Sequence, residues 1–201
     1  MKKISLIPKF YPIVDSYEWI EQLVPLGVKI IQLRIKNKSL GEIYEQASLA
    51  KLICEKYNCM LFLNDYWEIA LDLKLCGVHL GFEDQQLAHL NKIKESGLYL
   101  GLSTHCALEL ETALQISPSY IALGPIFETT LKKMNFGPQG IEKITQWREF
   151  IPAQIPLVAI GGITLERAND IYKAGANSIA VVSDVTTHHE PKKRVKNWLL
   201  H

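Results

Sequence analysis

Eight short apolar runs recur along the chain, and a stretch with helical periodicity follows each of them. Most runs show little polar alternation, which is typical of strands buried on both faces. Strands that alternate with helices predict right-handed βαβ units around a parallel sheet. The runs are Tyr11–Val14, Ile30–Arg34, Met60–Leu63, Gly77–Leu80, Leu98–Leu102, Tyr120–Leu123, Leu157–Ile160 and Ser178–Val182.

Eight such units fit a closed barrel, so we predict one α/β domain over residues 1–201, a single-domain (β/α)8 TIM barrel. A doubly wound open sheet is the alternative, but no G-x-G-x-x-G follows the first strand. The chain has 201 residues, close to the lower limit for this barrel, so its connections must be short. Because the first strand lies near the N-terminus, a helix closing the barrel bottom would be very short or absent.

The composition limits the kinds of partner that the chain is expected to bind and the compartment in which it is expected to lie. The formal net charge is +1, so no strongly basic face is demanded and nucleic acid is not the expected partner. No window approaches the ~20 apolar residues of a membrane span, and the N-terminus does not resemble a secretory signal. The four cysteines show no C-x-x-C pair and no disulfide pattern. We therefore expect a cytoplasmic protein, and the sequence leaves a homo-oligomer open.

Polar side chains gather where the predicted strands end, which is where parallel barrels carry their active sites. The second strand ends in Gln32-Leu33-Arg34-Ile35-Lys36. Alternate residues of a strand face the same way, so Gln32, Arg34 and Lys36 are expected to point together toward the barrel mouth. An amide, a guanidinium and an ammonium group suit a polyphosphate.

Two carboxylates follow the next two strands. Asp65 follows the third strand directly after Asn64, and Asp84 follows the fourth. Neighbouring strands lie ~5 Å apart, so the two carboxylates could share a hard cation such as Mg²⁺. Each also has a simpler interpretation as the N-cap of the following helix, as has Ser103 after the fifth strand. His79, within the fourth strand, is by itself more typical of a satisfied core residue.

The connection after the sixth strand is the longest in the chain and runs to about Gly140. Long loops in compact domains are usually functional. Gly161-Gly162 follows the seventh strand and Ser183 the eighth, where barrels often bind a phosphate monoester through backbone N–H groups. Two anionic subsites in one mouth predict a condensation with diphosphate as the leaving group.

At this point the chain resembles a known family, thiamine-phosphate synthase, also called thiamine-phosphate pyrophosphorylase. The resemblance spans nearly the whole chain, in order and at family spacing. The matching segments are QLRIK at 32–36, LFLNDYW at 61–67, GVHLGFED at 77–84, GLSTH at 101–105, YIALGPIFETTLKK at 120–133, GPQG at 137–140, VAIGGIT at 158–164 and SIAVVS at 178–183.

The resemblance implies a transferase that joins 4-amino-2-methyl-5-hydroxymethylpyrimidine diphosphate to 4-methyl-5-(2-phosphooxyethyl)thiazole, giving thiamine phosphate and diphosphate by a Mg²⁺-assisted dissociative substitution. It implies Mg²⁺ ligands at Asp65 and Asp84, and catalytic roles for Arg34, Lys36 and Lys132. The implied pyrimidine diphosphate site is Gln32, Leu33, Arg34, Ile35, Lys36, Asn64, Ser103 and Lys132. The implied thiazole phosphate site is Thr129, Thr130, Leu131, Gly162, Val182 and Ser183.

Three residues depart from the family pattern. Phe82 stands where glutamine is usual, and Leu131 replaces the second threonine of a Thr-x-Thr-Lys pattern. Asp184 stands where a small apolar residue is usual, and a carboxylate so near a phosphate is unfavourable unless it points away. The departures keep two alternatives open: a thiazole tautomerase of the TenI type, and a non-catalytic regulatory barrel that binds thiazole phosphate. Retention of the diphosphate and metal residues favours the synthase over the tautomerase.

Overall fold

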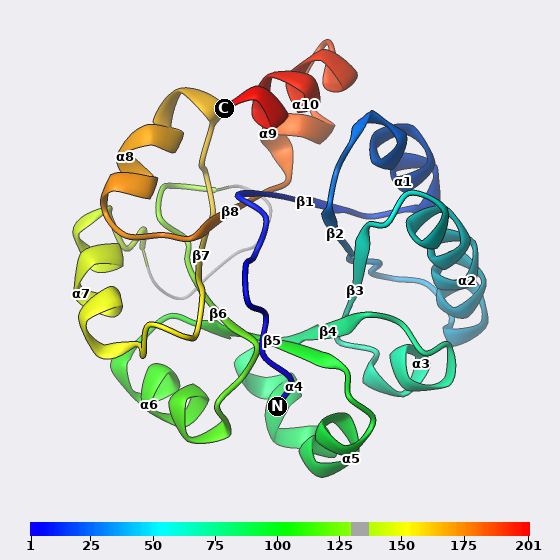
Figure 1. Cartoon of the computed structure of the whole chain (residues 1–201), viewed down its shortest axis with the longest axis horizontal. Coiled ribbons are helices and arrows are strands. Elements are labelled where there is room, and N and C mark those ends of the chain that lie inside the picture. The colour runs from blue at the N-terminus through cyan, green and yellow to red at the C-terminus, as the bar shows by residue number, and fades with distance from the viewer. Residues whose placement is uncertain (130–136) are drawn as a thin grey trace.

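The computed structural model describes residues 1–129 and 137–201. Eight parallel strands pair in chain order and close into a barrel, which confirms the predicted (β/α)8 fold (Figure 1). Their bounds lie close to the predicted apolar runs. The strands are β1 Phe10–Val14, β2 Ile30–Leu33, β3 Met60–Asn64, β4 Gly77–Leu80, β5 Tyr99–Thr104, β6 Tyr120–Leu123, β7 Leu157–Ile160 and β8 Ser178–Val181.

Helices form the outer layer around the barrel (Figure 1). The α-helices are α1 Tyr17–Leu23, α2 Leu40–Lys56, α3 Trp67–Asp72, α4 Phe82–Leu87, α5 Leu90–Glu95, α6 Ala107–Ile116, α7 Glu142–Phe150, α8 Ala168–Lys173, α9 Ser183–Thr186 and α10 Pro191–Leu200. Two short 3₁₀ helices, η1 and η2, span Val24–Leu26 and Leu165–Arg167.

The longest of the described helices, α2, shows how the sequence sets these elements. Ser39 and Glu42 form a reciprocal capping box that satisfies backbone N–H groups at its first turn. Its buried face includes Ile43, Ala47 and Ala50. Leu49 is also apolar but is 37% exposed. Successive residues of an α-helix are rotated by about 100°, and this rotation turns Leu49 away from the buried face.

The barrel has one apolar layer inside the strands and another between strands and helices. Alternate residues of each strand face the two layers. Three aromatic rings dominate the inner layer, with Phe62 edge-on to both Tyr11 and Tyr120. The inner layer consists of Ile4, Ile7, Tyr11, Ile13, Ile30, Phe62, Tyr120, Ala122, Val158 and Ala180.

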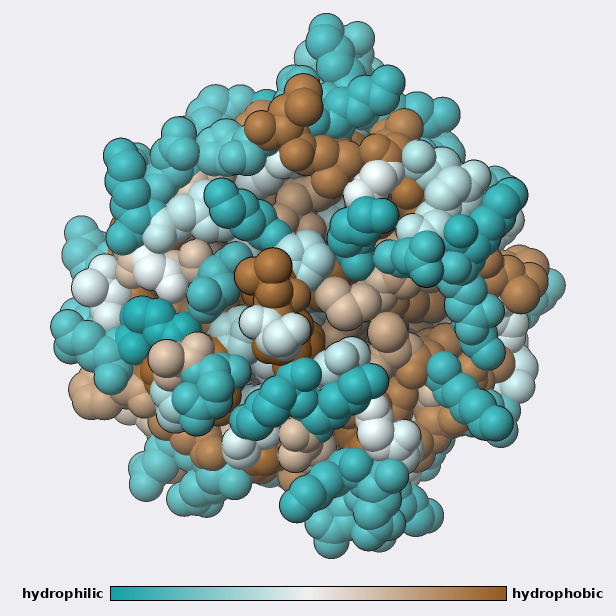
Figure 2. Space-filling view, in the orientation of Figure 1, coloured by the Kyte–Doolittle hydropathy of each residue, from teal (hydrophilic) through white to brown (hydrophobic). Residues whose placement is uncertain are grey.

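The N-terminal segment closes one end of the barrel without a helix, as expected. It crosses the barrel opening in Figure 1 before entering β1. Ile4 and Ile7 are buried against the inner layer, and the Ser119 hydroxyl donates a hydrogen bond to the Lys2 carbonyl oxygen (2.6 Å). Figure 2, in the same orientation, shows hydrophobic side chains toward the centre of this face within a largely hydrophilic rim.

Two glycines make room for the interior rings. Gly101 on β5 pairs with Tyr120 on β6, and a Cβ at Gly101 would overlap the Tyr120 ring and hydroxyl. A Cβ at Gly77 on β4 would lie 2.5 Å from the Phe62 ring. These positions therefore require glycine for its missing side chain, because the large rings of the neighbouring strands occupy that space.

We predict that Gly101→Ala lowers the free energy of unfolding by about 1–3 kcal/mol, the usual cost of overpacking a core. Chemical denaturation measures the change. Gly41→Ala is the matched control, since nothing lies within 4 Å of a Cβ there and the site is helical. It should be neutral or stabilise the fold by up to about 1 kcal/mol. Equal effects of the two changes would contradict the steric argument.

Candidate active site

Three charged side chains meet at the C-terminal ends of β2, β3 and β4. Lys36 Nζ lies 2.5 Å from Asp65 Oδ2. Burial, and next the charge and hydrogen bonding of Asp65, raise the pKa of Asp84, so the two carboxyl groups are close neighbours. The sequence prediction that these residues converge is therefore matched by the geometry. Because one ammonium group faces two carboxylates, the positive charge does not balance the negative charge, and a further cation would be favourable there.

The backbone fixes how these carboxylates are presented. Asp65 adopts a left-handed conformation with φ +67°, which Asp tolerates better than most residues. Its N–H donates to the His79 carbonyl oxygen (2.9 Å), which pins the turn to β4. Asp84 lies in the first turn of α4, and its Oδ2 sits 2.9 Å from where a Cβ on Gly81 would be. The carboxylate thus folds back toward the end of β4.

The simpler N-cap interpretations of these residues are wrong. Tyr66 is the N-cap of α3 and Gly81 is the N-cap of α4. Ser103 lies inside β5, three residues before the N-cap Cys106 of α6. None of the three predicted site residues is therefore explained by capping, which leaves their side chains available for a site.

His79 links the site to the barrel interior. Its Nε2 lies 2.9 Å from Ser103 Oγ and its Nδ1 lies 2.8 Å from the Tyr120 hydroxyl. Burial lowers the pKa of His79 to about 4, Asp65 partly opposes this, and Arg34 lowers it further. The imidazole is therefore neutral at physiological pH. As expected of a core histidine, both ring nitrogens are satisfied, but one partner is a predicted site residue.

Gln32 is the other predicted site residue tied to the interior. Its Nε2 donates to the Tyr11 hydroxyl (3.3 Å), which lies 3.0 Å from the Tyr120 hydroxyl. Sequence reasoning missed Tyr11 and Tyr120 as parts of the site. The available indication was their type: a tyrosine inside a barrel must find a partner for its hydroxyl.

The other residues predicted to bind the pyrimidine diphosphate differ in where their side chains lie. Asn64 is buried at the end of β3, where it pairs in register with His79. Leu33 and Ile35 pack into the layer between strands and helices, so only their backbone groups could serve a ligand. Their outward direction agrees with the predicted alternation that turns Gln32, Arg34 and Lys36 to the other side.

Glycine geometry shapes the loop after β7. Gly161 and Gly162 have φ +100° and +62°, and a Cβ on Gly162 would overlap the Glu128 carbonyl oxygen. Arg167 donates to the Gly162 carbonyl oxygen (2.8 Å). The loop is thereby held against the segment after β6. Of that segment's predicted residues, Thr129 is half-buried at its described edge, whereas Thr130, Leu131 and Lys132 lie outside the described residues.

The loop after β8 carries the remaining predicted residues. Val182 is the N-cap of α9 and Ser183 its first residue, directly after β8 and beside β7. The next residue, Asp184, points away toward α10. It accepts hydrogen bonds from Arg194 Nη2 (2.7 Å) and Trp198 Nε1 (2.6 Å). The concern that this carboxylate would face a phosphate is therefore removed.

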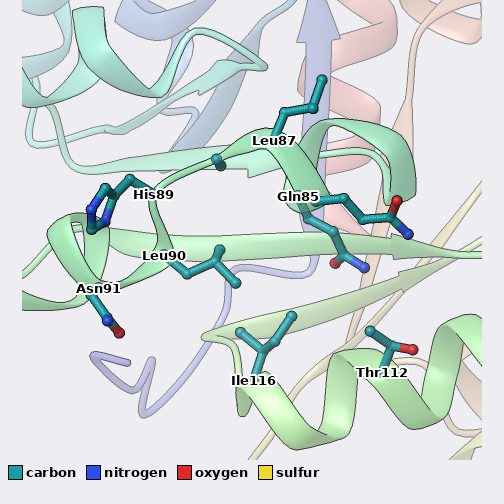
Figure 3. Close-up of a pocket in the computed structure, with 9 residues that line it drawn as sticks. Gln85, Leu87, His89, Leu90, Asn91, Thr112 and Ile116 are labelled. Atoms are coloured by element: carbon teal, nitrogen blue, oxygen red, sulfur yellow. The ribbon is translucent and has the colours of Figure 1, made fainter.

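Two surface pockets lie elsewhere. One of about 490 Å³ is lined by residues of α4, α5 and α6, with Gln85, Leu90 and Ile116 around it (Figure 3). Both amide atoms of Gln85 are closed off from solvent, and they have no partner among the described residues. A second pocket, of about 520 Å³, is lined in part by Cys54, Cys59 and Cys76. Neither is lined by the strand-end residues that form the charged cluster.

The described residues contain no group of three or more His, Cys, Asp or Glu side chains arranged to hold a metal ion. No helix in this part of the chain combines the length and apolarity needed to cross a bilayer. A cation at Asp65 and Asp84 would therefore need ligands from outside this set, such as substrate oxygens or water.

Comparisons with known proteins point to one family. The family model for thiamine monophosphate synthase matches residues 10–185. The thiamine-phosphate synthase of Rhizobium etli is 50% identical over 190 residues, covering 94% of this chain and 93% of that protein. The corresponding protein of Citrobacter koseri is 48% identical, covering 94% and 85%.

Solved structures agree with the fold and with the family. A thiamine phosphate pyrophosphorylase from Pyrococcus furiosus superposes with a TM-score of 0.83 at 29% identity, covering 96% of this chain and 94% of that one. A 3-hexulose-6-phosphate synthase from Salmonella typhimurium reaches a TM-score of 0.68 at 15% identity, covering 94% and 96%. The second likeness shows the barrel fold alone.

We predict that Arg194→Met lowers the free energy of unfolding by about 3 kcal/mol, because it leaves the carboxylate of Asp184 buried without its partner. The side chains of Asp184 and Arg194 are only 6% and 10% exposed. Denaturant unfolding measures the loss. Lys193→Met removes an exposed cation from the same helix and should change stability by less than about 0.5 kcal/mol. A similarly small effect of Arg194→Met would refute the idea that Arg194 stabilises the fold by pairing with Asp184.

Proposed function

Because the chain belongs to the thiamine monophosphate synthase family, whose members are transferases, we propose that it condenses two phosphorylated heterocycles. The substrates are 4-amino-2-methyl-5-hydroxymethylpyrimidine diphosphate and 4-methyl-5-(2-phosphooxyethyl)thiazole, and the products are thiamine phosphate and diphosphate. The observation that carries the proposal is the cluster of Lys36, Asp65 and Asp84 at neighbouring strand ends, with Arg34 beside it.

Arg34 and Lys36 serve the leaving group. In a dissociative substitution the bond to diphosphate breaks before the thiazole nitrogen attacks, so negative charge grows on the departing oxygens. Fixed cations at that position stabilise this charge more in the transition state than in the ground state. Lys132 is proposed to join them from the loop after β6. No protein nucleophile is required, and the neutral His79 need not act as a base.

Asp65 and Asp84 are proposed to hold a divalent cation. Asp65 and Asp84 supply two close carboxylates, and Mg²⁺ prefers one or two carboxylates with water and phosphate oxygens. When bound, Mg²⁺ would add positive charge at the diphosphate oxygens. Burial raises the pKa of Asp84, and the neighbouring Asp65 charge raises it further, so a cation there would favour the ionised carboxylate. Lys36 already compensates part of the Asp65 charge through its contact with that carboxylate.

Gln32, Asn64 and Ser103 are proposed to orient the pyrimidine diphosphate. All three lie at the barrel mouth on β2, β3 and β5. Leu33 and Ile35 would contribute backbone groups only, since their side chains face the outer layer.

The thiazole phosphate is proposed to bind between the loops after β7 and β8. Gly162 lets the backbone come close to the ligand, and Val182 and Ser183 begin a short helix. Thr129, Thr130 and the Leu131 backbone would approach from the loop after β6. Asp184 is paired with Arg194 and so does not oppose the anion. Positioning of the two substrates would supply much of the acceleration.

A coupled diphosphate-release assay with each substrate omitted in turn tests the proposal. We expect diphosphate and thiamine phosphate only when both substrates and Mg²⁺ are present. Isomerisation of the thiazole phosphate alone would favour the tautomerase alternative. Thiazole phosphate binding without any turnover would favour the regulatory barrel.

We predict that Arg34→Ala lowers kcat/KM for the pyrimidine diphosphate by about 10²–10³, the usual loss when one group that stabilises developing charge is removed. The KM for thiazole phosphate should change little. Lys38→Ala is the control, because Lys38 is an exposed cation that pairs with Glu42 on α2. Equal losses in both variants would mean that general surface charge, rather than Arg34, serves the leaving group.

We predict that Asp84→Asn stabilises the Mg²⁺-free protein by about 0.5 kcal/mol, a small effect because the charge that it removes is partly exposed to solvent. The same substitution should weaken the dependence of the reaction on Mg²⁺. Since folding raises the pKa of Asp84, its protonated form stabilises the fold. The stabilising effect of the substitution should therefore grow as pH rises through that raised pKa. Unfolding curves over a pH series and Mg²⁺ titrations measure both. Glu83→Gln should retain the full Mg²⁺ dependence, and loss of this contrast would reject Asp84 as the ligand.

A further inference from the structure

Five side chains from five strands form one continuous row of hydrogen-bonding groups through the barrel interior. Its contacts are 3.3, 3.0, 2.8 and 2.9 Å long in order. We call it the interior chain, and it consists of Gln32, Tyr11, Tyr120, His79 and Ser103. Its two ends, Gln32 and Ser103, are both residues that the proposed function assigns to the pyrimidine diphosphate.

The interior chain can make all its bonds and also place both buried tyrosine protons in hydrogen bonds in only two ways. Each tyrosine hydroxyl has one proton, and a neutral imidazole has one N–H. If Gln32 donates to Tyr11, the buried Tyr11 proton has Tyr120 as its acceptor, because otherwise it would be left without a partner. Continued along the chain, His79 accepts at Nδ1 and donates from Nε2 to the serine. If the Gln32 amide is rotated and accepts instead, every bond reverses and the serine donates to His79.

The two ends therefore always differ in what remains for a ligand. In the first direction Gln32 Oε1 stays available as an acceptor, and the Ser103 hydroxyl proton stays available as a donor. In the reversed direction an amide N–H of Gln32 is left over, and Ser103 offers only an acceptor. The Gln32 amide in the structure is turned as the first direction requires, with Nε2 toward the Tyr11 hydroxyl.

We propose that the interior chain runs in the first direction and thereby makes Gln32 an acceptor and Ser103 a donor toward the ligand. This inference rests on the proposed function, because that function supplies the ligand. In place of the polyphosphate contact first expected of the Gln32 amide, this direction matches an exocyclic amino group of the pyrimidine at the Gln32 acceptor. It also matches an anionic diphosphate oxygen at the Ser103 donor. Tyr11, Tyr120 and His79 are positioning residues, since they act through the two ends.

The first direction places the His79 proton on Nε2 and leaves Nδ1 without a proton. Gln32→Glu replaces a group that can donate with a carboxylate that, when ionised, only accepts. It should reverse the chain and move the His79 proton to Nδ1, three hydrogen bonds away. In a Tyr11→Phe background the same substitution should have no such effect, because the connection is broken.

Long-range ¹H–¹⁵N correlation spectra of histidine-labelled, ligand-free protein distinguish the two tautomers. His79 is assigned by comparison with His79→Asn, and spectra extend to about pH 9 so that a buried carboxyl at 32 is ionised. We expect Nε2–H in the original chain, Nδ1–H in Gln32→Glu, and no switch when Tyr11→Phe is also present. Gln115→Glu, the same change on the exposed face of α6, should leave the original tautomer.

An Nδ1–H tautomer in the original chain would overturn the proposed direction. A switch that survives Tyr11→Phe would show that charge acts through space and would overturn the role of the chain. An unchanged tautomer in Gln32→Glu at the highest pH would do the same. None of these readouts needs turnover, so an inactive protein would count against the proposed function without affecting this test.

Discussion

Closure of the sheet between β1 and β8 is the constraint on which the rest of the structure depends. Tyr11 and Ala180 are partners across this seam. Closure turns eight strand ends into one ring, so that residues far apart in the sequence share one mouth. It also makes the interior small, and a few large rings fill it. Because two of those rings are tyrosines, their hydroxyls must be satisfied inside, and Gln32 and His79 are the groups that do so.

The charges at the mouth do not fully balance one another. Asp65 is matched by Lys36, but Asp84 has a raised pKa because it is partly buried beside a second carboxylate. An additional cation would lower this repulsion, and cations at Arg34 and Lys36 would in turn attract an anion. The same small region therefore suits a cation and a polyanion together, and each would strengthen the binding of the other.

The sequence predicted the elements, and the closeness of Lys36, Asp65 and Asp84, because both follow from local patterns. Apolar runs gave the strands, alternation placed Gln32, Arg34 and Lys36 on one side, and the order of parallel strands brought Asp65 beside Asp84. The family resemblance is confirmed by the match over residues 10–185. The roles of all the predicted site residues stay predictions, and Thr130, Leu131 and Lys132 also lie outside the described part of the chain.

Other features could not be predicted because they depend on the three-dimensional register. Tyr120 reaches His79 only because Gly101 lies opposite it and leaves room. A single strand shows neither the partner nor the space. The N-cap interpretations failed for a related reason: helix starts differ by a residue or two, and such a shift decides whether a side chain caps a helix or faces a site.

Asp184, which departs from the family pattern, lies beside the same seam between β1 and β8. Asp184 follows β8, and its partners Arg194 and Trp198 lie on α10. Trp198 in turn stacks on Phe10 of β1, with ring centroids 5.2 Å apart. Asp184 therefore ties the end of the last strand to the helix that covers the first. Arg194 also binds Glu166 beside the loop after β7, and these hydrogen bonds lower the pKa of Glu166 to about 2.

One guanidinium group thus joins the loops after β7 and β8, between which the thiazole phosphate is proposed to bind. A small apolar residue at position 184 could not hold these loops to α10. The carboxylate costs the phosphate little, because hydrogen bonds from Arg194 and Trp198 already compensate its charge. Asp184 therefore points away from the proposed phosphate subsite and helps to hold the loop after β8 to α10.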